Sequence, residues 1–431
     1  MAMGSKIIST RDKWLIAALG LGFTALGLWF YMRDLPPDMM SLYLAGWFFD
    51  HGQSAEIYQY AIADLFVFDF PESWGRVAAQ QGYSSTVLYP FLYPPYIAAF
   101  FAPLSTQLDV AGFSLVLYLV HLPMVFVSIF LSWRIAGQPG HWGVWFAVAL
   151  GLFFVTAGGL LALAQNQLQI TIVFILLLAF ERYQARKMRL AGVLFAIAGS
   201  IKIAPMALGV LFLARKQGRG AGYMAAAGLL ILGGSVLWVG VGLHLAYAAQ
   251  IAEIGDHVYI NRHNWSLYTM LYQLEALIEG VSLGGGIDVT TVETAPQWLK
   301  LVNASVLVLG VIWVWMRFRH GLKRHQEVAL FVFLLTLIGL TSPLGWSHNF
   351  IPMIYFAPAL LYWFSQRIGV LLIAAVFGGQ MLLLQLYLAA QYTGLNWAQM
   401  AGTSAVLLGA AVFAWVSTRP EVANSADNAV S

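Results

Sequence analysis

Long apolar runs separated by short polar segments recur along the whole chain. They begin with Trp14–Tyr31 and end with Trp397–Val416. Many of them approach the roughly 20 residues that a helix needs to cross a bilayer. Because backbone polar groups must be satisfied inside lipid, runs of this length form helices. The pattern predicts an all-α polytopic membrane protein with about ten to twelve spanning helices in one unit, residues 1–417, followed by a disordered polar tail, residues 418–431.

Composition supports this interpretation. Hydrophobic residues make up 60% of the 431 positions and charged residues only 10%, whereas ordinary globular chains carry roughly 25% charged residues. The chain has no cysteine, so disulfides, thiol nucleophiles and thiolate metal sites are excluded. The net charge of +3 decides little, because in a membrane protein the distribution of Lys and Arg between loops carries the information.

That distribution predicts an orientation. Basic clusters lie at the N-terminus, at Arg182–Arg189, at Arg215–Arg219 and at Arg317–Arg324, and the positive-inside rule places all of them in the cytoplasm. The tail is then cytoplasmic as well. Two long segments, residues 32–90 and 244–297, face outward.

One segment leaves two topologies open. If the clusters before Leu190 and after Ala214 are both cytoplasmic, the apolar stretch of about 25 residues between them cannot cross the bilayer once. Either the stretch forms a hairpin bent near Lys202–Pro205, or one of the clusters lies outside. Hydropathy does not decide between these alternatives.

The outward segments contain stretches that are apolar but too short or too mixed to span. Met40–Phe49, Ile57–Phe70 and Ser266–Ile278 have this character. Helices that combine an apolar face with a polar face lie at the membrane surface. We therefore expect juxtamembrane helices in both outward segments.

Asp38 is the first candidate for chemistry. It follows Pro36 and Pro37 just beyond the first predicted span, where a carboxylate can be partly desolvated and still be reached from water. Partial burial raises the pKa of such a carboxyl group, which can then act as a general base toward a hydroxyl group. The structural alternative is that Asp38 caps the helix that follows, since Asp is a favoured N-cap residue.

Two further motifs allow both a structural and a ligand-binding interpretation. Tyr93 precedes Pro94 and Pro95 at a predicted membrane boundary, where aromatic residues usually anchor the chain but can also line a ligand pocket. Asn166 and Gln167 belong to a row of amide side chains between two apolar runs. Amides in this position either join helices or bind a substrate.

Lys202 lies within an apolar segment, where a cation is costly and therefore indicates a function, with phosphate as its natural partner. A lysine that snorkels to the membrane boundary is the alternative. Polar and aromatic residues also gather in two outward positions: Arg262, His263, Asn264 and Trp265 in the second long segment, and Trp346, His348 and Asn349 further on. An interfacial His is more often structural, but His348 could bond a phosphate or a leaving oxygen.

Other function classes lack their signatures. The sequence has no grouping of metal ligands such as H-E-x-x-H, no Walker A loop and no dinucleotide-binding fingerprint. Basic patches interleaved with aromatics, as found in nucleic-acid-binding proteins, are also absent. We expect neither a cofactor, nor a dedicated metal, nor a nucleic-acid partner. The sequence does not indicate an oligomeric state.

Taken in order, these motifs resemble glycosyltransferase family 87, the polyprenyl-phosphate-mannose-dependent mannosyltransferases related to the enzyme that extends phosphatidylinositol mannosides. The resemblance covers roughly residues 34–355. It rests on Asp38 with Tyr43, Tyr93-Pro94-Pro95, Asn166-Gln167, Lys202 with Pro205, Asn264 with Ser266, and Ser342-Pro343 with Trp346 and His348.

The resemblance implies a GT-C-like helical bundle with a catalytic Asp in the first outer loop. It implies that Asp38 is the general base and that His348 and Lys202 contact the donor phosphate. Substrate contacts are expected from Tyr43, Tyr93, Asn166, Gln167, Arg262, Asn264 and Trp346. The implied reaction moves a sugar, mannose above all, from a polyprenyl-phosphate donor to a lipid or glycan acceptor at the outer face of a bacterial plasma membrane.

Two other classes remain open. Polytopic bundles of this size are often transporters or lipid flippases, although ion-coupled carriers usually need ionisable relays deep within the apolar runs. None of the 19 Asp and Glu residues has such a position. A membrane scaffold, in which Asp38 only caps a helix, is the other possibility.

Overall fold

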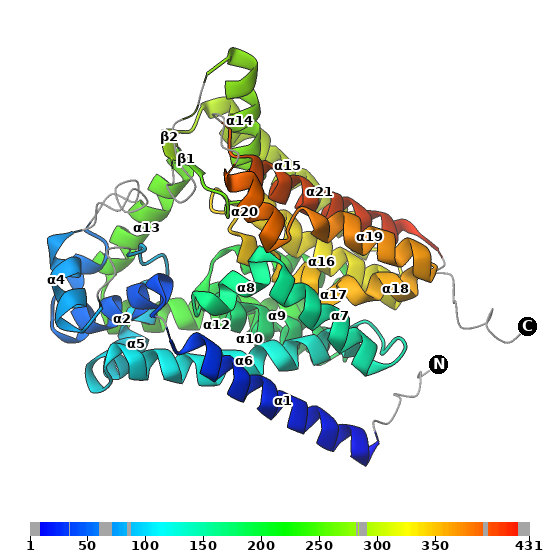
Figure 1. Cartoon of the computed structure of the whole chain (residues 1–431), viewed down its shortest axis with the longest axis horizontal. Coiled ribbons are helices and arrows are strands. Elements are labelled where there is room, and N and C mark those ends of the chain that lie inside the picture. The colour runs from blue at the N-terminus through cyan, green and yellow to red at the C-terminus, as the bar shows by residue number, and fades with distance from the viewer. Residues whose placement is uncertain are drawn as a thin grey trace, which may run out of the picture.

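The computed structural model describes residues 9–33, 35–59, 71–83, 88–281, 283, 291–390 and 395–420. Helices dominate these residues, and the first residues of α1 and the last residues of α21 lie at the right-hand end of the bundle in Figure 1. The helices of the first half are α1 (Thr10–Tyr31), α2 (Pro37–Asp50), η1 (Ser54–Ile57), α4 (Glu72–Gln80), α5 (Pro95–Gln107), α6 (Val110–Ile135), α7 (Trp142–Val155), α8 (Ala157–Ala164), α9 (Gln169–Gln184), α10 (Met188–Ile201), η2 (Ala204–Leu208) and α11 (Gly209–Ala214).

The second half adds a two-stranded antiparallel sheet to the helices. Strands β1 and β2 pair with His257 opposite Thr294 and Ile260 opposite Thr291. The elements are α12 (Gly218–Val239), α13 (Val241–Asp256), β1 (His257–Ile260), α14 (Leu267–Glu279), β2 (Thr291–Thr294), α15 (Gln297–Phe318), α16 (Arg324–Leu340), η3 (Ser347–Phe350), α17 (Ile351–Phe356), η4 (Ala357–Ala359), α18 (Leu360–Trp363), α19 (Gln366–Gly378), α20 (Leu382–Ala390) and α21 (Trp397–Thr418).

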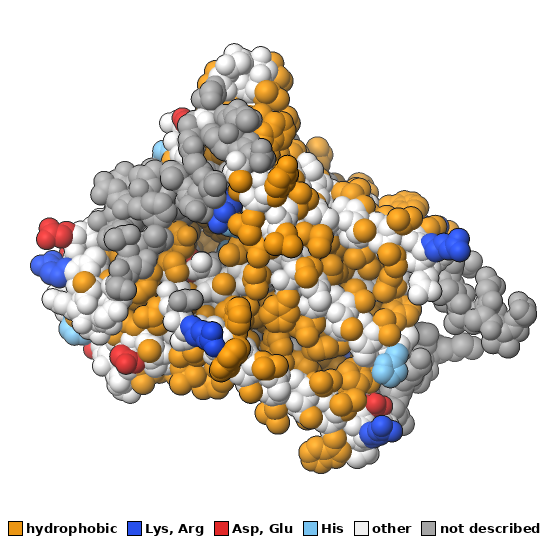
Figure 2. Space-filling model, in the orientation of Figure 1, with side chains coloured by type: hydrophobic (Ala, Val, Ile, Leu, Met, Phe, Trp, Pro, Cys, Tyr) orange, Lys and Arg blue, Asp and Glu red, His pale blue; other side chains and the backbone are white. Residues whose placement is uncertain are grey.

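The helices include several that can span a membrane. Within the described residues, five helices are long and apolar enough, namely α1, α6, α12, α15 and α21, and a sixth span results if the bent pair α8 and α9 counts as one. Apolar side chains cover much of the bundle surface in Figure 2, and Leu237 of α12 is 89% exposed. An all-α polytopic membrane protein is therefore confirmed. A total of ten to twelve spans would also require shorter apolar helices such as α7, α10 and α19, and it stays a prediction.

Charged side chains from several helices meet at one end of the bundle. Arg134 of α6 pairs with Glu181 of α9 at 3.1 Å, and Arg215 pairs with Glu327 of α16. Arg324 donates to the backbone oxygen of Arg134 at 2.7 Å. We call this cluster, Arg134, Glu181, Arg215, Arg324 and Glu327, the basic end. It brings together two of the basic regions recognised in the sequence, and Arg182 of a third region pairs with Glu181.

The segment with the open topology forms a hairpin. Helix α10 ends at Ile201, and the chain then turns back through η2 and α11. The ring of Phe212 in α11 consequently lies 5.9 Å from Phe195 in α10 and 5.6 Å from Tyr183 in α9. Because Tyr183 is close to the basic end, both flanking basic clusters are on the same side. Lys202 is at the tip of the hairpin.

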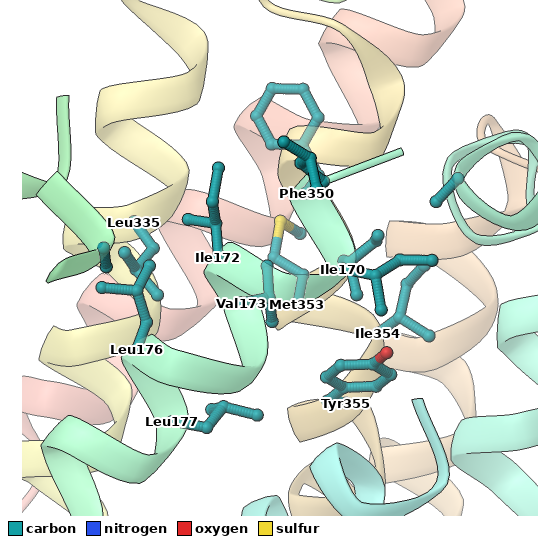
Figure 3. Packing of buried hydrophobic residues seen from close by; sticks show 14 of the residues in the cluster. Ile170, Ile172, Val173, Leu176, Leu177, Leu335, Phe350, Met353, Ile354 and Tyr355 are labelled. Atoms are coloured by element: carbon teal, nitrogen blue, oxygen red, sulfur yellow. The ribbon is translucent and has the colours of Figure 1, made fainter. Parts of the chain in front are cut away.

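The core is built around α9. Its apolar side chains pack against α16 and α17, as Figure 3 shows, and Phe180 stacks on Phe331 of α16 at 3.9 Å. This packing fixes the position of the N-terminus of α9, where the chain bends. The labelled residues of the cluster are Ile170, Ile172, Val173, Leu176, Leu177, Leu335, Phe350, Met353, Ile354 and Tyr355.

Two of the three predicted surface helices lie within the described residues. The stretch Met40–Phe49 lies within α2, and Ser266–Ile278 corresponds to α14, which Ser266 caps by accepting from the backbone N–H of Thr269. Both stretches are helical, and their position at a membrane surface stays a prediction. Most of Ile57–Phe70 and of the predicted tail lies outside the described residues. The prediction missed α4 and the strand pair.

Candidate functional site

The candidate site begins at the N-terminus of α2. Pro36 is the N-cap residue, Pro37 opens the helix, and Asp38 follows in the first turn. Proline suits this position because its missing N–H is not needed there. The side chain of Asp38 does not cap α2. It accepts a hydrogen bond from Nε2 of Gln167 instead, so the structural alternative of a capping Asp is not what the structure shows.

The carboxyl group of Asp38 is largely desolvated, but Asp38 remains partly accessible to solvent. Its residue is partly exposed, while the residues that follow, Met39 and Met40, are fully buried. Helix α2 is not among the helices that can span a membrane. Burial raises the pKa of Asp38 to about 6, against the opposing effects of the hydrogen bond from Gln167 and the charge of Lys202. This pKa lets the group exchange a proton near neutral pH.

Gln167 reaches Asp38 because the chain is broken between α8 and α9. The two helices meet at an angle of 115°, and the break exposes polar side chains at its corner. Gln165 uses its Oε1 atom to accept from the backbone N–H of Asp38 at 3.4 Å. Two neighbouring amides thus hold the first turn of α2 from the same break.

Asn166 points elsewhere. Its backbone is left-handed, with φ +49°, which directs its side chain away from those of its neighbours. Its Oδ1 atom lies 2.7 Å from Nδ1 of His121, and its Nδ2 atom donates to the backbone oxygen of Ser114 at 3.0 Å. Asn166 therefore joins the break to α6, which is the helix-joining role considered for this row of amides.

The tip of the α10–η2 hairpin supplies a cation. Nζ of Lys202 donates to Oδ1 of Asn349 at 2.8 Å and lies 3.4 Å from Oε1 of Gln169. Asn349 is itself held by donating to the backbone oxygen of Leu344 at 3.1 Å. Lys202 points inward to these groups while its neighbour Ile203 is 55% exposed on the outer surface of the bundle. Lys202 does not snorkel to solvent.

Two distant segments are joined next to this lysine. The backbone N–H of Ser347 donates to the oxygen of His263 at 2.7 Å, and that of Trp265 donates to the oxygen of Gly345 at 2.8 Å. Asn264 is fully buried and donates to the oxygen of Pro343 at 2.9 Å. Asn264 therefore secures the loop that carries His348.

His348 is a neutral imidazole in this position. It is 8% exposed, and burial together with the nearby charges of Lys202 and His263 holds its pKa well below the usual value. Within the described residues its ring forms no hydrogen bond with another residue. A neutral imidazole retains one N–H that can donate to a ligand oxygen.

The expected site residues therefore divide into two groups. Asp38, Gln167, Lys202 and His348 form one electrostatically connected set. Burial and, to a smaller extent, the charge of Asp38 raise the pKa of Tyr93. Five others face elsewhere or support the loops: Asn166 contacts α6, Asn264 joins two loops, Trp346 bridges to Asn264, Arg262 donates to His263 at 2.8 Å, and Tyr43 donates to Gln81 at 3.0 Å.

The sequence assigned no role to Gln169, Asn349 or His263, although the structure places all three beside Lys202 or His348. All three belong to polar stretches noted in the sequence, so each had a signal but no indication of its partner. Within the described part of the chain, no group of three or more His, Asp or Glu residues is placed to hold a metal ion.

Comparison with known families identifies the chain. The model of glycosyltransferase family 87 matches residues 91–345, more than half of the 431 positions. The chain belongs to this family. Tyr93, Gln167 and Lys202 lie within the matched region of this glycosyltransferase, whereas His348 lies just beyond it and Asp38 lies well before it. A comparison with curated proteins found no match.

Proposed function

We propose that this glycosyltransferase transfers a sugar, mannose first of all, from a polyprenyl-phosphate donor to a hydroxyl group of a lipid or glycan acceptor. The observation that carries the proposal is the meeting of a partly exposed carboxyl group, Asp38, with an inward-pointing cation, Lys202, and a neutral imidazole, His348. Family membership supplies the class of reaction. Neither a cofactor nor an obligatory metal is part of the proposal.

The proposed reaction is a single displacement with inversion at the anomeric carbon. Asp38 takes the proton of the acceptor hydroxyl as its oxygen bonds to the anomeric carbon, and the bond from that carbon to the phosphate oxygen breaks. The electron pair leaves with the lipid phosphate. Because Gln167 engages one carboxylate oxygen of Asp38, the other is free to receive the proton.

The leaving phosphate is an anion, and its stabilisation requires donors already in place. Lys202 supplies a positive charge, and His348 supplies the N–H of a neutral ring. Both are preorganised, since Asn349 fixes the ammonium group and the loop junction at Asn264 fixes the histidine segment. Preorganised donors in a site with little water stabilise developing charge more strongly than water does.

The depth of the site is consistent with a lipid-borne donor. Helix α10 runs from the basic end to Lys202 over 14 residues, so the lysine is about 21 Å from that end at 1.5 Å per residue. This distance approaches the far boundary of a hydrocarbon core about 30 Å thick. With the basic end in the cytoplasm, the site would open at the outer face of the membrane, which we propose is a bacterial plasma membrane.

Substitution of Asp38 tests the proposal. We expect Asp38→Asn and Asp38→Ala to lower transfer from a polyprenyl-phosphate-mannose donor by about 10²–10⁴-fold, because each removes the base. Transfer is measured with the purified full-length protein in lipid nanodiscs. Glu72→Gln is the matched control, since Glu72 is an exposed carboxylate of α4. Full activity in both Asp38 variants would refute the assignment of the base.

The pH dependence provides a second test. The base must be ionised to act, and the pKa of Asp38 is raised to about 6. Transfer by the wild-type protein should therefore increase with pH and reach half of its plateau near pH 6, instead of near the value of about 4 for an ordinary Asp. The profile is measured from the initial rate at saturating donor. A rate that does not change between pH 5 and pH 8 would contradict a base of this kind.

A further inference from the structure

A hollow lies at the end of α2 opposite Asp38. It has a volume of about 430 Å³ and is open at the surface between α2, α4 and the junction of α5 with α6. Asp38 and Asp50 are twelve residues apart on one helix, so about 18 Å separates this hollow from the proposed base. Charged and histidine side chains are visible at this left-hand end of the molecule in Figure 2. The residues that matter here are Tyr43, Trp47, Asp50, His51, Gln81 and Asp109.

Packing makes the hollow part of the same rigid unit as the site. Gly46 of α2 approaches the backbone of Phe101 and Ala102 in α5 so closely that an added Cβ would lie 3.0 Å from the carbonyl carbon of Phe101. The hydroxyl of Tyr43 shares its one hydrogen between Oε1 of Gln81 at 3.0 Å and the backbone oxygen of Leu108 at 3.2 Å, beyond the end of α5. The two helices therefore connect the hollow directly to Asp38 and Tyr93.

The hydrogen-bonding groups of the hollow are mainly acceptors. Nδ1 of His51 lies 2.8 Å from the backbone oxygen of Trp47, and because a carbonyl only accepts, Nδ1 carries a hydrogen, which leaves Nε2 to face a ligand. Asp109 uses Oδ1 to accept from Gly112 at 2.7 Å and has a second oxygen left. Asp50 adds an exposed carboxylate.

The remaining lining groups complement these acceptors. Oε1 of Gln81 accepts a hydrogen bond from the hydroxyl of Tyr43, so the NH₂ group of Gln81 is available as a donor. The ring of Trp47 stacks on that of His51 at 3.8 Å and 17°, which holds both rings in one orientation. The hollow therefore combines a fixed aromatic pair with carboxylate, imidazole and amide groups.

This combination selects a class of ligand. Two carboxylates repel phosphates and other anions, and no group of three or more His, Asp or Glu among the described residues is placed to hold a metal ion. A neutral molecule rich in hydroxyl donors satisfies acceptors of this kind, and its C–H faces pack on aromatic rings. Saccharides have both properties, and 430 Å³ is within the usual range for a small-molecule pocket.

We infer that the distal hollow, lined by Trp47, Asp50, His51, Gln81 and Asp109, binds a sugar unit of the acceptor, which is therefore a glycan chain extending about 18 Å beyond the reacting hydroxyl. The inference rests on the proposed function for the identity of the acceptor. The saccharide chemistry of the hollow follows from its own lining. Binding here would hold the acceptor in register without contacting the reacting atoms.

Direct binding tests the saccharide chemistry without any transfer. Mannotetraose, maltotetraose and, as an anionic contrast, glucose 6-phosphate are added to the full-length protein in nanodiscs, and saturation-transfer NMR is recorded. We expect a signal for at least one tetrasaccharide and none for the phosphate. Trp47→Ala and Asp50→Asn should each reduce the signal at least five-fold. Asp38→Asn and Glu72→Gln should retain it.

The variants are chosen so that unfolding cannot produce the result. Asp50→Asn keeps the shape of an exposed side chain, and Trp47→Phe keeps an aromatic ring and should restore binding that Trp47→Ala removes. Unchanged thermal unfolding midpoints verify the fold. The inference is overturned if neither tetrasaccharide gives a signal, or if Asp50→Asn and Trp47→Ala give the wild-type signal.

Inhibition and steady-state kinetics test whether the saccharide that binds in the hollow is part of the acceptor. The tetrasaccharide that binds should inhibit transfer competitively with respect to the acceptor, and Asp50→Asn should raise the KM for that acceptor about ten-fold at unchanged kcat, as loss of uniform binding requires. Noncompetitive inhibition would overturn the assignment to the acceptor. Loss of transfer in the Asp38 variants belongs to the proposed base and does not affect this result.

Discussion

Two interruptions of the apolar helices bring polar side chains to one place, and they do so by different means. Between α8 and α9 the chain turns by 115° and continues toward the basic end, whereas between α10 and α11 it turns back on itself. The first break supplies amides and the second supplies one cation, Lys202. Irregular backbone at membrane depth is tolerated only inside protein or around a cavity. Together the breaks convert an apolar bundle into a polar site.

Within the first break, one amide has a structural role and its neighbour contacts the proposed base. Asn166 and Gln167 are adjacent amides, yet the left-handed backbone of Asn166 sends them to opposite partners. Asn166 bonds to His121 inside the bundle, and Gln167 bonds to Asp38 in the site. Substitutions at the two breaks should therefore affect different observables.

The largest effect is expected at the hairpin tip. Lys202→Met removes the side-chain cation that donates to Asn349, and transfer should fall by about 10²–10³-fold, as for loss of one preorganised donor to a developing anion. Lys202→Arg should retain part of the activity. The measurement is single-turnover transfer at saturating donor. Lys300→Met, which disrupts an exposed ion pair with Asp256, is the control. Equal losses in both Met variants would show that Lys202 acts only through the fold.

A smaller effect with a distinct signature is expected at Gln167. Its hydrogen bond lowers the pKa of Asp38, so Gln167→Leu should raise that pKa and shift the midpoint of the pH profile upward from about 6. The rate at pH 7 should fall by about ten-fold, because fewer carboxyl groups are ionised and their orientation is lost. Initial rates between pH 5 and pH 9 measure both changes. An unchanged midpoint would mean that Gln167 does not position the base.

The smallest effect on activity is expected at Asn166. Asn166→Leu leaves His121 and the backbone oxygen of Ser114 without their partner, which should lower the free energy of unfolding by about 1–2 kcal/mol. The pH midpoint should stay near 6, since Asn166 does not contact Asp38. Thermal unfolding and the pH profile are measured on the same preparation. A shifted midpoint with unchanged stability would place Asn166 in the site.

The sequence predicted the membrane class, and it singled out the residues that the structure brings together around Asp38, because both depend on residue type. Hydropathy identified the spans α1 and α21, and the cost of a buried cation drew attention to Lys202. Average hydropathy did not indicate where helices break, so the segmentation of α17, η4 and α18 around Pro352 and Pro358 was missed.

The sequence also did not show the direction in which side chains point. Tyr43 and Asn166 were expected to contact the substrates of the proposed site, but Tyr43 lines the distal hollow and Asn166 faces α6. Spacing along a helix fixes the relative direction of side chains only while the helix is regular. One residue with positive φ, as at Asn166, removes that relation. The partners of Lys202 were hidden for a similar reason, since Asn349 is 147 positions away.

The hairpin also changes how sidedness is counted along the chain. An apolar hairpin enters the membrane and returns to the same side. The chain after Ala214 is therefore on the same side of the membrane as the chain before Met188. A count based on hydropathy alone would invert every later loop. Since the chain contains no cysteine, single cysteines placed at Lys187 and at Lys216 have no background, and an impermeant thiol reagent should label both from the same side.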